Sequence, residues 1–456
     1  MTRVAARRIV KDMNSRVREV QFTAPRNILA HAVAVLLTAG TAVLAGAQTP
    51  AATQPAEPAL IGRAAFTDRL NPPAYEPMNP LPREQFDLGK VVFNTTWVPA
   101  GQGGEADRDG LGPLFVTKSC ESCHNNGERG RAASAPGKLS NSFVMQLGGP
   151  PTVYNHVINN QAIEGHKPEA LIDISWRERA GRHADGSKWT LREPVYAVTE
   201  LQHGPLPPGT VLRPRIAPAV FGNGLLESVS QKALQAVRDA QPAAVRGDLL
   251  ARLGWQAEVA NIADQSAHAF AREMGVTSLW EAQDDCTPEQ TDCRAAPNGG
   301  EREVSGELFA AVVAYQTRLA VPARPVRDAV LDQKGAELFA ATGCAACHQP
   351  YLPVSRLDGP ARIDAYTDLM RHDLGDELAD RTVDGQPVPS LWRTAPLWGL
   401  AHVLQDRDVA LLHDGRARSV EEAILWHGGQ AQASRRAFSA LKRVQREQLL
   451  AWLATL

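Results

Sequence analysis

The chain has 456 residues, enough for two or three ordinary domains with a substantial core. Its 48 lysines and arginines nearly balance its 50 aspartates and glutamates. Such a balanced surface gives no reason to expect nucleic acid or an anionic membrane as a partner. Proline (32) and glycine (36) are plentiful and aromatic residues make up only 6%, which favours long structured loops between helices.

The N-terminus has the pattern of an export signal. Basic residues precede an apolar run, 28–47, which ends in the sequence Ala-Gly-Ala. This order predicts a signal peptide over residues 1–47, with Met13 as an alternative start, and a periplasmic protein without a membrane span after cleavage. Residues 48–75 then form a flexible tether. An uncleaved membrane anchor is the alternative, because about twenty apolar residues just span a bilayer.

Two pentapeptides have the form C-x-x-C-H. They are Cys120-Glu-Ser-Cys123-His124 and Cys344-Ala-Ala-Cys347-His348. This spacing is the signature of c-type haem attachment: two thiols add to the two vinyl groups of one porphyrin, and the adjacent histidine binds the iron. The sequence therefore predicts two covalently attached c-type haems, with His124 and His348 as iron ligands.

A thioredoxin-like redox pair and a zinc site are the alternative interpretations of these cysteines. A redox pair does not need the adjacent histidine, and no strand pattern precedes either motif. A zinc site would usually bring both cysteine pairs close in sequence, whereas these pairs lie in opposite halves of the chain. An apolar stripe containing Leu338 and Phe339 predicts a helix over 332–340 that leads into the second motif, whereas the stretch 109–113 before the first motif is loop-like.

The third cysteine pair, Cys286 and Cys293, encloses a polar loop without a histidine. In an exported protein a structural disulfide is the simpler interpretation, and redox-active thiols are the alternative.

The second axial ligand of each iron separates electron transfer from catalysis. The two halves of the chain contain similar segments that could supply such ligands. They are 215–222 with 393–399, and 264–275 with 420–428. Each member of the second pair reads as a short helix that ends in a potential ligand followed by glycine, which suits a helix C-terminus.

Five further segments are characteristic of one family. They are 109–115, 371–375, 392–400, 412–417 and 426–429. Through them the chain, from about Phe86 to Leu456, resembles the di-haem oxidoreductases, once labelled thiol oxidoreductases, which are relatives of the bacterial di-haem cytochrome c peroxidases and the MauG-type enzymes. The thiol label has little support in these residues, because the motifs and the third pair account for all six cysteines.

The resemblance implies a ligand for the C-terminal haem. In the peroxidase relatives, the helix after the His-Asp-Gly-Arg motif supplies a methionine to the electron-transferring haem, and His427 occupies that place here. Ligation by His348 and His427 is therefore expected, with a lower reduction potential than a thioether ligand would give. His372 and His413 are rival ligands, and a helix-end histidine without iron is the plainer alternative.

The resemblance also places the chemistry at the N-terminal haem. In the relatives a tryptophan carries electrons between the haems, and a glutamine and a glutamate line the distal side; Trp255, Gln265 and Glu273 occupy these places. A carboxylate there would take a proton from the inner oxygen of peroxide and deliver it to the leaving oxygen. The gap between the glutamine and the glutamate is shorter than in the peroxidases. Met274 as an axial ligand, His268 as a second reaching group, and a solvated Glu273 are the alternatives.

These observations predict a mainly α fold of two cytochrome c-like haem domains with long loops and insertions. The N-terminal haem domain is expected over 76–325 and the C-terminal cytochrome c domain over 326–456, with the boundary at prolines that follow a helix over 306–319. Short hairpins such as 188–198 are expected within 135–220, a stretch predicted to cover the first haem.

The expected function is that of an exported di-haem oxidoreductase of the cytochrome c peroxidase type. Electrons would enter by the C-terminal haem from a small cytochrome or cupredoxin-like protein, and peroxide or oxygen would react at the N-terminal haem. Two other classes stay open: an electron carrier with both irons six-coordinate, and a redox partner or sensor of another exported system. The insertions around the first haem argue against a simple carrier, which needs far fewer residues per haem.

Overall fold

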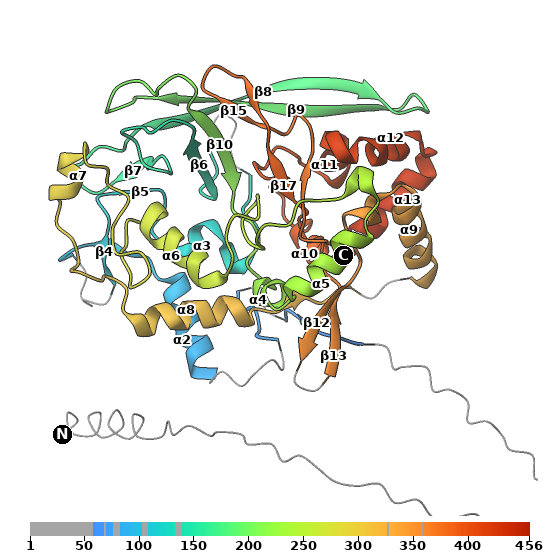
Figure 1. Cartoon of the computed structure of the whole chain (residues 1–456), viewed down its shortest axis with the longest axis horizontal. Helices are drawn as coiled ribbons and strands as arrows, with labels where there is room; N and C mark the ends of the chain where they lie inside the picture. Colours follow the sequence, from blue (N-terminus) through green and yellow to red (C-terminus); the bar gives the residue numbers. More distant parts are fainter. Residues whose placement is uncertain are drawn as a thin grey trace, which may run out of the picture. The chain divides into compact units, whose positions relative to one another are not determined.

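The computed structural model describes residues 58–67, 70–75, 83–102, 108–132, 139–325, 328–356 and 359–456. The predicted signal peptide and residues 48–57, 68 and 69 of the predicted tether lie outside these ranges, whereas the rest of the tether lies within them. None of the helices within them is long and apolar enough to cross a membrane. The described residues belong to one compact unit (Figure 1).

The prediction of a mainly α fold is wrong. Helices contain 31% of the described residues and strands 21%, and the strands form many small sheets, so two cytochrome c-like domains are not shown either. The strands were hidden in stretches expected to be loops, although β8 (Leu171–Arg182) alternates apolar and polar residues in the two-residue period of a strand. The domain boundary near residue 325 stays a prediction.

Short helices surround both haem-attachment motifs. In the described ranges they are α2 (Arg83–Asn94), α3 (Cys120–Cys123), α4 (Asn223–Glu227), α5 (Gln231–Ala240), α6 (Ile262–Glu273), α7 (Thr291–Ala295), α8 (Gly306–Arg318), α9 (Ala329–Ala341), α10 (Leu400–Val403), α11 (Val420–Trp426), α12 (Gln432–Ala440) and α13 (Arg443–Leu453). The predicted helices before the second motif and before the prolines are confirmed as α9 and α8.

Helices α2 and α8 pack closely beside the first motif. A side chain on Gly89 would lie 1.9 Å from the carbonyl oxygen of Ala311, so only glycine permits this approach. The rings of Phe86 and Phe93 lie 5.0 and 5.3 Å from that of Tyr315. Helices α9 and α13 are joined in a similar way beside the second motif, where Gly335 lies under the indole of Trp452.

The largest sheet has four antiparallel strands and joins the two halves of the chain. In order these are β16 (Pro387–Val388), β15 (Asp380–Thr382), β10 (Val211–Ile216) and β6 (Phe143–Gly148). A second sheet has the order β1 (Ala59–Leu60), β13 (Gly359–Ile363) and β12 (Leu352–Arg356). The remaining strands pair as β2 (Arg63–Ala64) with β11 (Val321–Pro322), β3 (Val98–Pro99) with β4 (Asp109–Leu111), β5 (Leu114–Phe115) with β7 (Gln161–Ala162), and β14 (Arg371–Asp373) with β17 (Leu391–Arg393).

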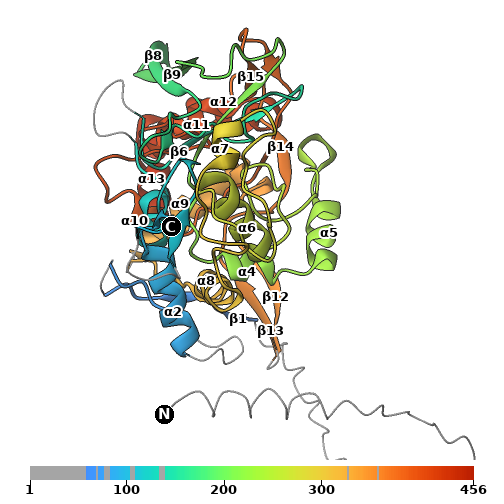
Figure 2. The same ribbon diagram turned by 90° about the vertical axis from the view of Figure 1, so that its left-hand side faces the viewer.

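A long hairpin connects the N-terminal half to the C-terminal helices. Strand β8 pairs with β9 (Lys188–Thr199) along its whole length. Residues 188–198, predicted to form a short hairpin by themselves, are therefore one strand of a longer hairpin. Figures 1 and 2 show it at the end of the molecule opposite α2 and α8. At its tip Asp185 accepts a 2.8 Å bond from Arg446 of α13, and the Ala184 amide donates to the Ser439 carbonyl of α12. The hairpin therefore covers the C-terminal helices, whereas other parts of the stretch 135–220, such as Val144 and Arg215, line a cavity beside the first motif.

The similar segments 215–222 and 393–399 pack against each other. Gly222 begins α4 at φ +76°, and Gly399 begins α10 at φ +72°. A side chain on Gly222 would lie 2.5 Å from the Trp398 indole, and one on Gly399 would lie 2.5 Å from the Phe221 ring. Each half thus inserts an aromatic ring over the glycine of the other.

Candidate functional site

The second motif lines a cavity of about 260 Å³. Cys344, Cys347 and His348 reach it from the turn that follows α9, and His427 reaches it from the C-terminus of α11. The wall is completed mainly by apolar side chains, such as that of Phe339. Both predicted ligands of the C-terminal haem therefore face the same cavity.

Hydrogen bonds fix the orientation of these two imidazoles. Nδ1 of His348 donates to the carbonyl oxygen of Tyr366 (2.9 Å), and Nδ1 of His427 donates to that of Ala423 (2.7 Å). A proton on Nδ1 leaves the lone pair on Nε2, which is the atom that binds iron. Burial lowers the pKa of His348 to about 4 and also lowers that of His427, so both rings are neutral at pH 7.

Backbone strain lies beside His348. Tyr366, whose carbonyl orients that ring, has φ +51° although it is not glycine. Such left-handed residues cost of order 1–3 kcal/mol and persist where the surroundings determine them. The backbone carbonyl of this strained residue therefore fixes the orientation of the His348 imidazole.

The first motif lines a second cavity, of about 140 Å³. Its histidine repeats the same arrangement: Nδ1 of His124 donates to the carbonyl oxygen of Pro218 (2.7 Å), and burial lowers its pKa to about 4. Cys120 and Cys123 lie on the same wall, in α3.

The structure brings the predicted distal residues together at this first cavity. Trp255, Gln265, Glu273 and Met274 all line it, whereas His268 lies elsewhere on α6. Burial raises the pKa of Glu273 to about 7, opposed in part by the charge of Arg272. The carboxyl is thus poised to exchange a proton near neutral pH.

The end of α6 is fixed by the segment that leads into the first motif. The carbonyl of Glu273 accepts the amides of Val116 (2.8 Å) and Thr117 (3.1 Å), and that of Met274 accepts the amide of Gly112 (2.9 Å). A side chain on Gly112 would lie 2.6 Å from the Cα of Gly275. The Gly-Leu-Gly-Pro sequence therefore serves this close contact, which sets Glu273 over the cavity.

The motif cysteines are suited to thioether bonds. None of the four forms a disulfide within the structure. Burial raises the pKa of Cys120, Cys123 and Cys347 to about 12, so these thiols are neutral at pH 7. The predicted disulfide between Cys286 and Cys293 is confirmed.

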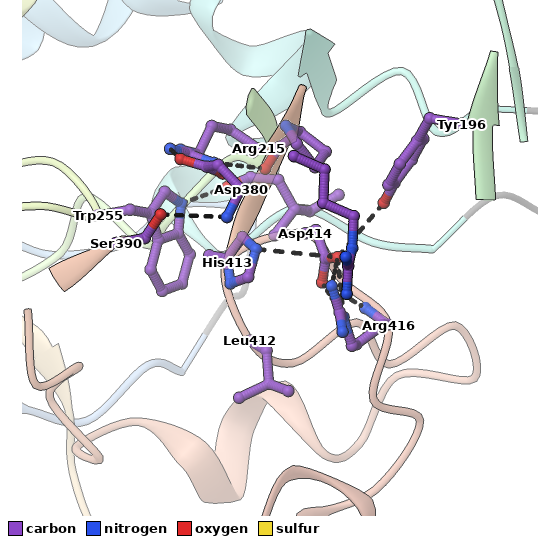
Figure 3. Close-up of polar contacts among 12 residues, drawn as sticks. Tyr196, Arg215, Trp255, Asp380, Ser390, Leu412, His413, Asp414 and Arg416 are labelled. Atoms are coloured by element: carbon purple, nitrogen blue, oxygen red, sulfur yellow. Dashed lines mark hydrogen bonds and ion pairs between the residues drawn. The ribbon is translucent and has the colours of Figure 1, made fainter. Parts of the chain in front are cut away.

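The two rival ligands differ: His372 has hydrogen-bond partners, whereas Nε2 of His413, which also lines the second cavity, has none among the described residues. Nε2 of His372 lies 2.9 Å from Asp368, and its Nδ1 lies 3.8 Å from the Cys347 sulfur, which leaves neither nitrogen free for iron. His413 stacks on Trp392 at 3.8 Å, and its Nε2 lies 3.9 Å from the carboxylate of Asp414. Figure 3 shows His413 directed toward this carboxylate.

The two cavities share a wall. Trp255 and Arg393 line both of them. The indole nitrogen of Trp255 donates to the backbone carbonyl of Ile216 (2.8 Å). The backbone carbonyl of Trp255 accepts a hydrogen bond from the backbone amide of Arg393 (2.9 Å). Figure 3 places Trp255 beside the His413 loop. Arg393 was missed in the sequence, although its correspondence to Arg215 in the repeat could have indicated it.

Comparison with known proteins identifies one family. The family described as "Di-haem oxidoreductase, putative peroxidase" matches residues 226–456, just over half of the chain, including the second motif and Glu273 but not the first motif. No curated protein sequence matches this chain. A solved structure, hydrazine synthase of Kuenenia stuttgartiensis pressurized with 20 bar xenon, aligns over 92% of this chain and 100% of its own. The sequence identity is 13% and the TM-score is 0.37, too low to indicate a shared function. The family match shows that this protein belongs to the di-haem oxidoreductases.

Proposed function

We propose that the protein is an exported di-haem peroxidase of the cytochrome c peroxidase type. It would take electrons at the C-terminal haem and use them at the N-terminal haem to reduce hydrogen peroxide, with two electrons and two protons, to two waters. The proposal rests on the pair of adjoining cavities: one is lined by His348 and His427, and the other by His124 and the buried carboxyl of Glu273.

The residues fit two covalently attached haems. Each cavity has two unbridged cysteines and a histidine whose Nε2 is left free by its Nδ1 hydrogen bond. Thioether bonds would form at Cys120 and Cys123 in the first cavity, and at Cys344 and Cys347 in the second. The haems supply irons that change oxidation state and, in the first cavity, a site where peroxide binds.

Glu273 would perform the proton transfer in the first cavity. Its carboxylate takes the proton of the inner peroxide oxygen and delivers it to the outer oxygen, which leaves as water. A pKa near 7 makes both directions of this transfer accessible at neutral pH. Gln265, on the same face of α6 two turns earlier, would donate its amide to the bound oxidant.

The second cavity would serve electron transfer. His348 and His427 both line it and would both hold the iron, which would leave no position for a substrate. Electrons would enter here from a small cytochrome or cupredoxin-like protein in the periplasm and pass through Trp255 to the first haem.

One observation favours a second candidate, an electron carrier. Met274 follows Glu273 and also lines the first cavity, and a thioether bound to iron would close that site. An enzyme that opens only after reduction would look the same in its oxidised state.

The test uses protein matured with a c-type cytochrome system. We expect two haems per chain, and an oxidised EPR spectrum with one high-spin and one low-spin ferric haem. Peroxide should then be consumed with a reduced small cytochrome, and Glu273→Gln should lose this activity while Glu307→Gln, an exposed change on α8, should keep it. Two low-spin haems and no turnover, even after reduction of the C-terminal haem, would favour the carrier.

A further inference from the structure

The shared wall holds a buried positive charge that no carboxylate of the described residues pairs with. Arg393 is only 8% exposed, lines both cavities and forms no ion pair with another described residue. Its Nε donates to the carbonyl of Gly254 (2.9 Å), whereas its Nη1 has no hydrogen-bond partner.

The repeat provides an internal comparison. Arg215 occupies the matching position in the first half and lines the first cavity. Two of its nitrogens lie 2.7 and 2.8 Å from the carboxylate oxygens of Asp380. Figure 3 shows this ion pair. The charge of Arg215 is therefore neutralised by the protein, and that of Arg393 is not.

A buried guanidinium without an anion is costly. Burial lowers the pKa of Arg393 to about 10, even though the charges of Glu258 and Asp368 oppose that change. Glu258 is exposed to solvent, and Asp368 is already bonded to His372 and Gln241. A carboxylate from a molecule bound in the cavities would therefore neutralise the charge of Arg393.

We propose that Arg393 binds one propionate of each haem, and that its charge raises the reduction potential of both. This inference rests on the two haems of the proposed function. Each haem carries two carboxylates, and a guanidinium fork can bond to a carboxylate on each side. A positive charge nearby disfavours the more positive ferric state, so it favours reduction.

A second arginine provides a comparison, because it lines one cavity and not both. Arg129 lines the second cavity and donates to the carbonyls of Ala410 and Leu412. Among the described lining residues it is not part of the first cavity. Its removal should therefore act more strongly on the C-terminal haem than on the N-terminal haem.

The experiment is a spectroelectrochemical titration of both haems over a range of pH. Arg393→Gln should lower both potentials, and should move the pH dependence of both toward neutrality because the propionates lose the cation that keeps their pKa low. Arg129→Gln should lower the C-terminal potential more than the N-terminal one, and the exposed Arg302→Gln should change neither.

Arg393→Lys keeps the charge without the fork, so it should shift both potentials by less than the glutamine variant. It also provides the test if the glutamine variant does not assemble. Unchanged potentials in both Arg393 variants, with two haems bound, would overturn the proposal, and a change confined to one haem would overturn the shared role. Wild-type protein without two attached haems would instead contradict the proposed function.

Discussion

Glu273 is a buried carboxyl on the wall of the first cavity, and its titration should be visible in the activity. With a pKa of about 7 it is protonated in mildly acidic solution and cannot take the proton of peroxide. We therefore expect kcat/KM for peroxide to rise with pH through about 7 and to level off above it. Glu273→Gln should abolish this limb and lower turnover by roughly 10²–10⁴-fold.

The same shift has a consequence for stability. The pKa rises from 4.5 in the unfolded chain to about 7 in the folded protein, so between these values the folded state holds a proton that the unfolded state has released. Folding stability therefore falls as pH rises through this window. Glu273→Gln should therefore remove this dependence of the unfolding free energy on pH. If the pH–rate profile of the same variant equals that of wild type, Glu273 is not the base.

His427 can be tested by the ligand that the peroxidase relatives use. Its Nε2 faces the second cavity while Nδ1 is bonded to Ala423, so a methionine at this position would exchange imidazole for thioether. His427→Met should change the low-spin EPR signal and raise the potential of the C-terminal haem. His268→Gln, elsewhere on α6, is the control, and identical spectra for wild type and His427→Met would refute the assignment.

At the scale of elements, the contact between the two halves depends on paired glycines. Gly222→Ala and Gly399→Ala would each add a methyl group 2.5 Å from a ring of the opposite half, at positive φ. We expect each to lower the free energy of unfolding by about 2–4 kcal/mol, from overpacking and left-handed strain together. Thermal or urea unfolding of the haem-loaded protein measures this loss.

Gly385→Ala separates the two causes. Gly385 has φ +86°, but nothing lies within 4 Å of the added methyl group. Its cost should be the strain alone, about 1–2 kcal/mol. Equal losses at all three glycines would mean that the aromatic rings move aside without penalty.

The helices around the motifs could be predicted because their signals are local. The apolar stripe before Cys344 and the ligand-then-glycine endings of α6 and α11 lie within single short segments. The sheets were missed because their pairings are distant: β10 bonds to β15, far along the chain, and no local pattern announces such a partner. Arg393 was missed for a related reason, since its lack of a counterion is visible only in three dimensions.

At the scale of the whole molecule, the motif cysteines and histidines follow from spacing alone, but the distance between the haems does not. The wall built from Trp255 and Arg393 places the two cavities against each other. It unites residues from the family-matched half with His124 and Pro218, which precede the matched segment. The proposed redox chemistry would therefore require residues of both halves.

Electrons that pass between the two proposed haems would cross this wall. The guanidinium carbon of Arg129 lies 4.9 Å from the centre of the Trp255 ring, and its positive charge opposes loss of an electron from that ring. We therefore expect Trp255 to act as a bridge and not to accumulate as a radical. After rapid reduction of the C-terminal haem, Trp255→Phe should slow electron transfer to the N-terminal haem several-fold, with haem content and spin states unchanged. Trp280→Phe, at a tryptophan 50% exposed and stacked on Phe309, should leave this rate unchanged. If the rate in Trp255→Phe equals that of wild type, electrons cross the wall by another route.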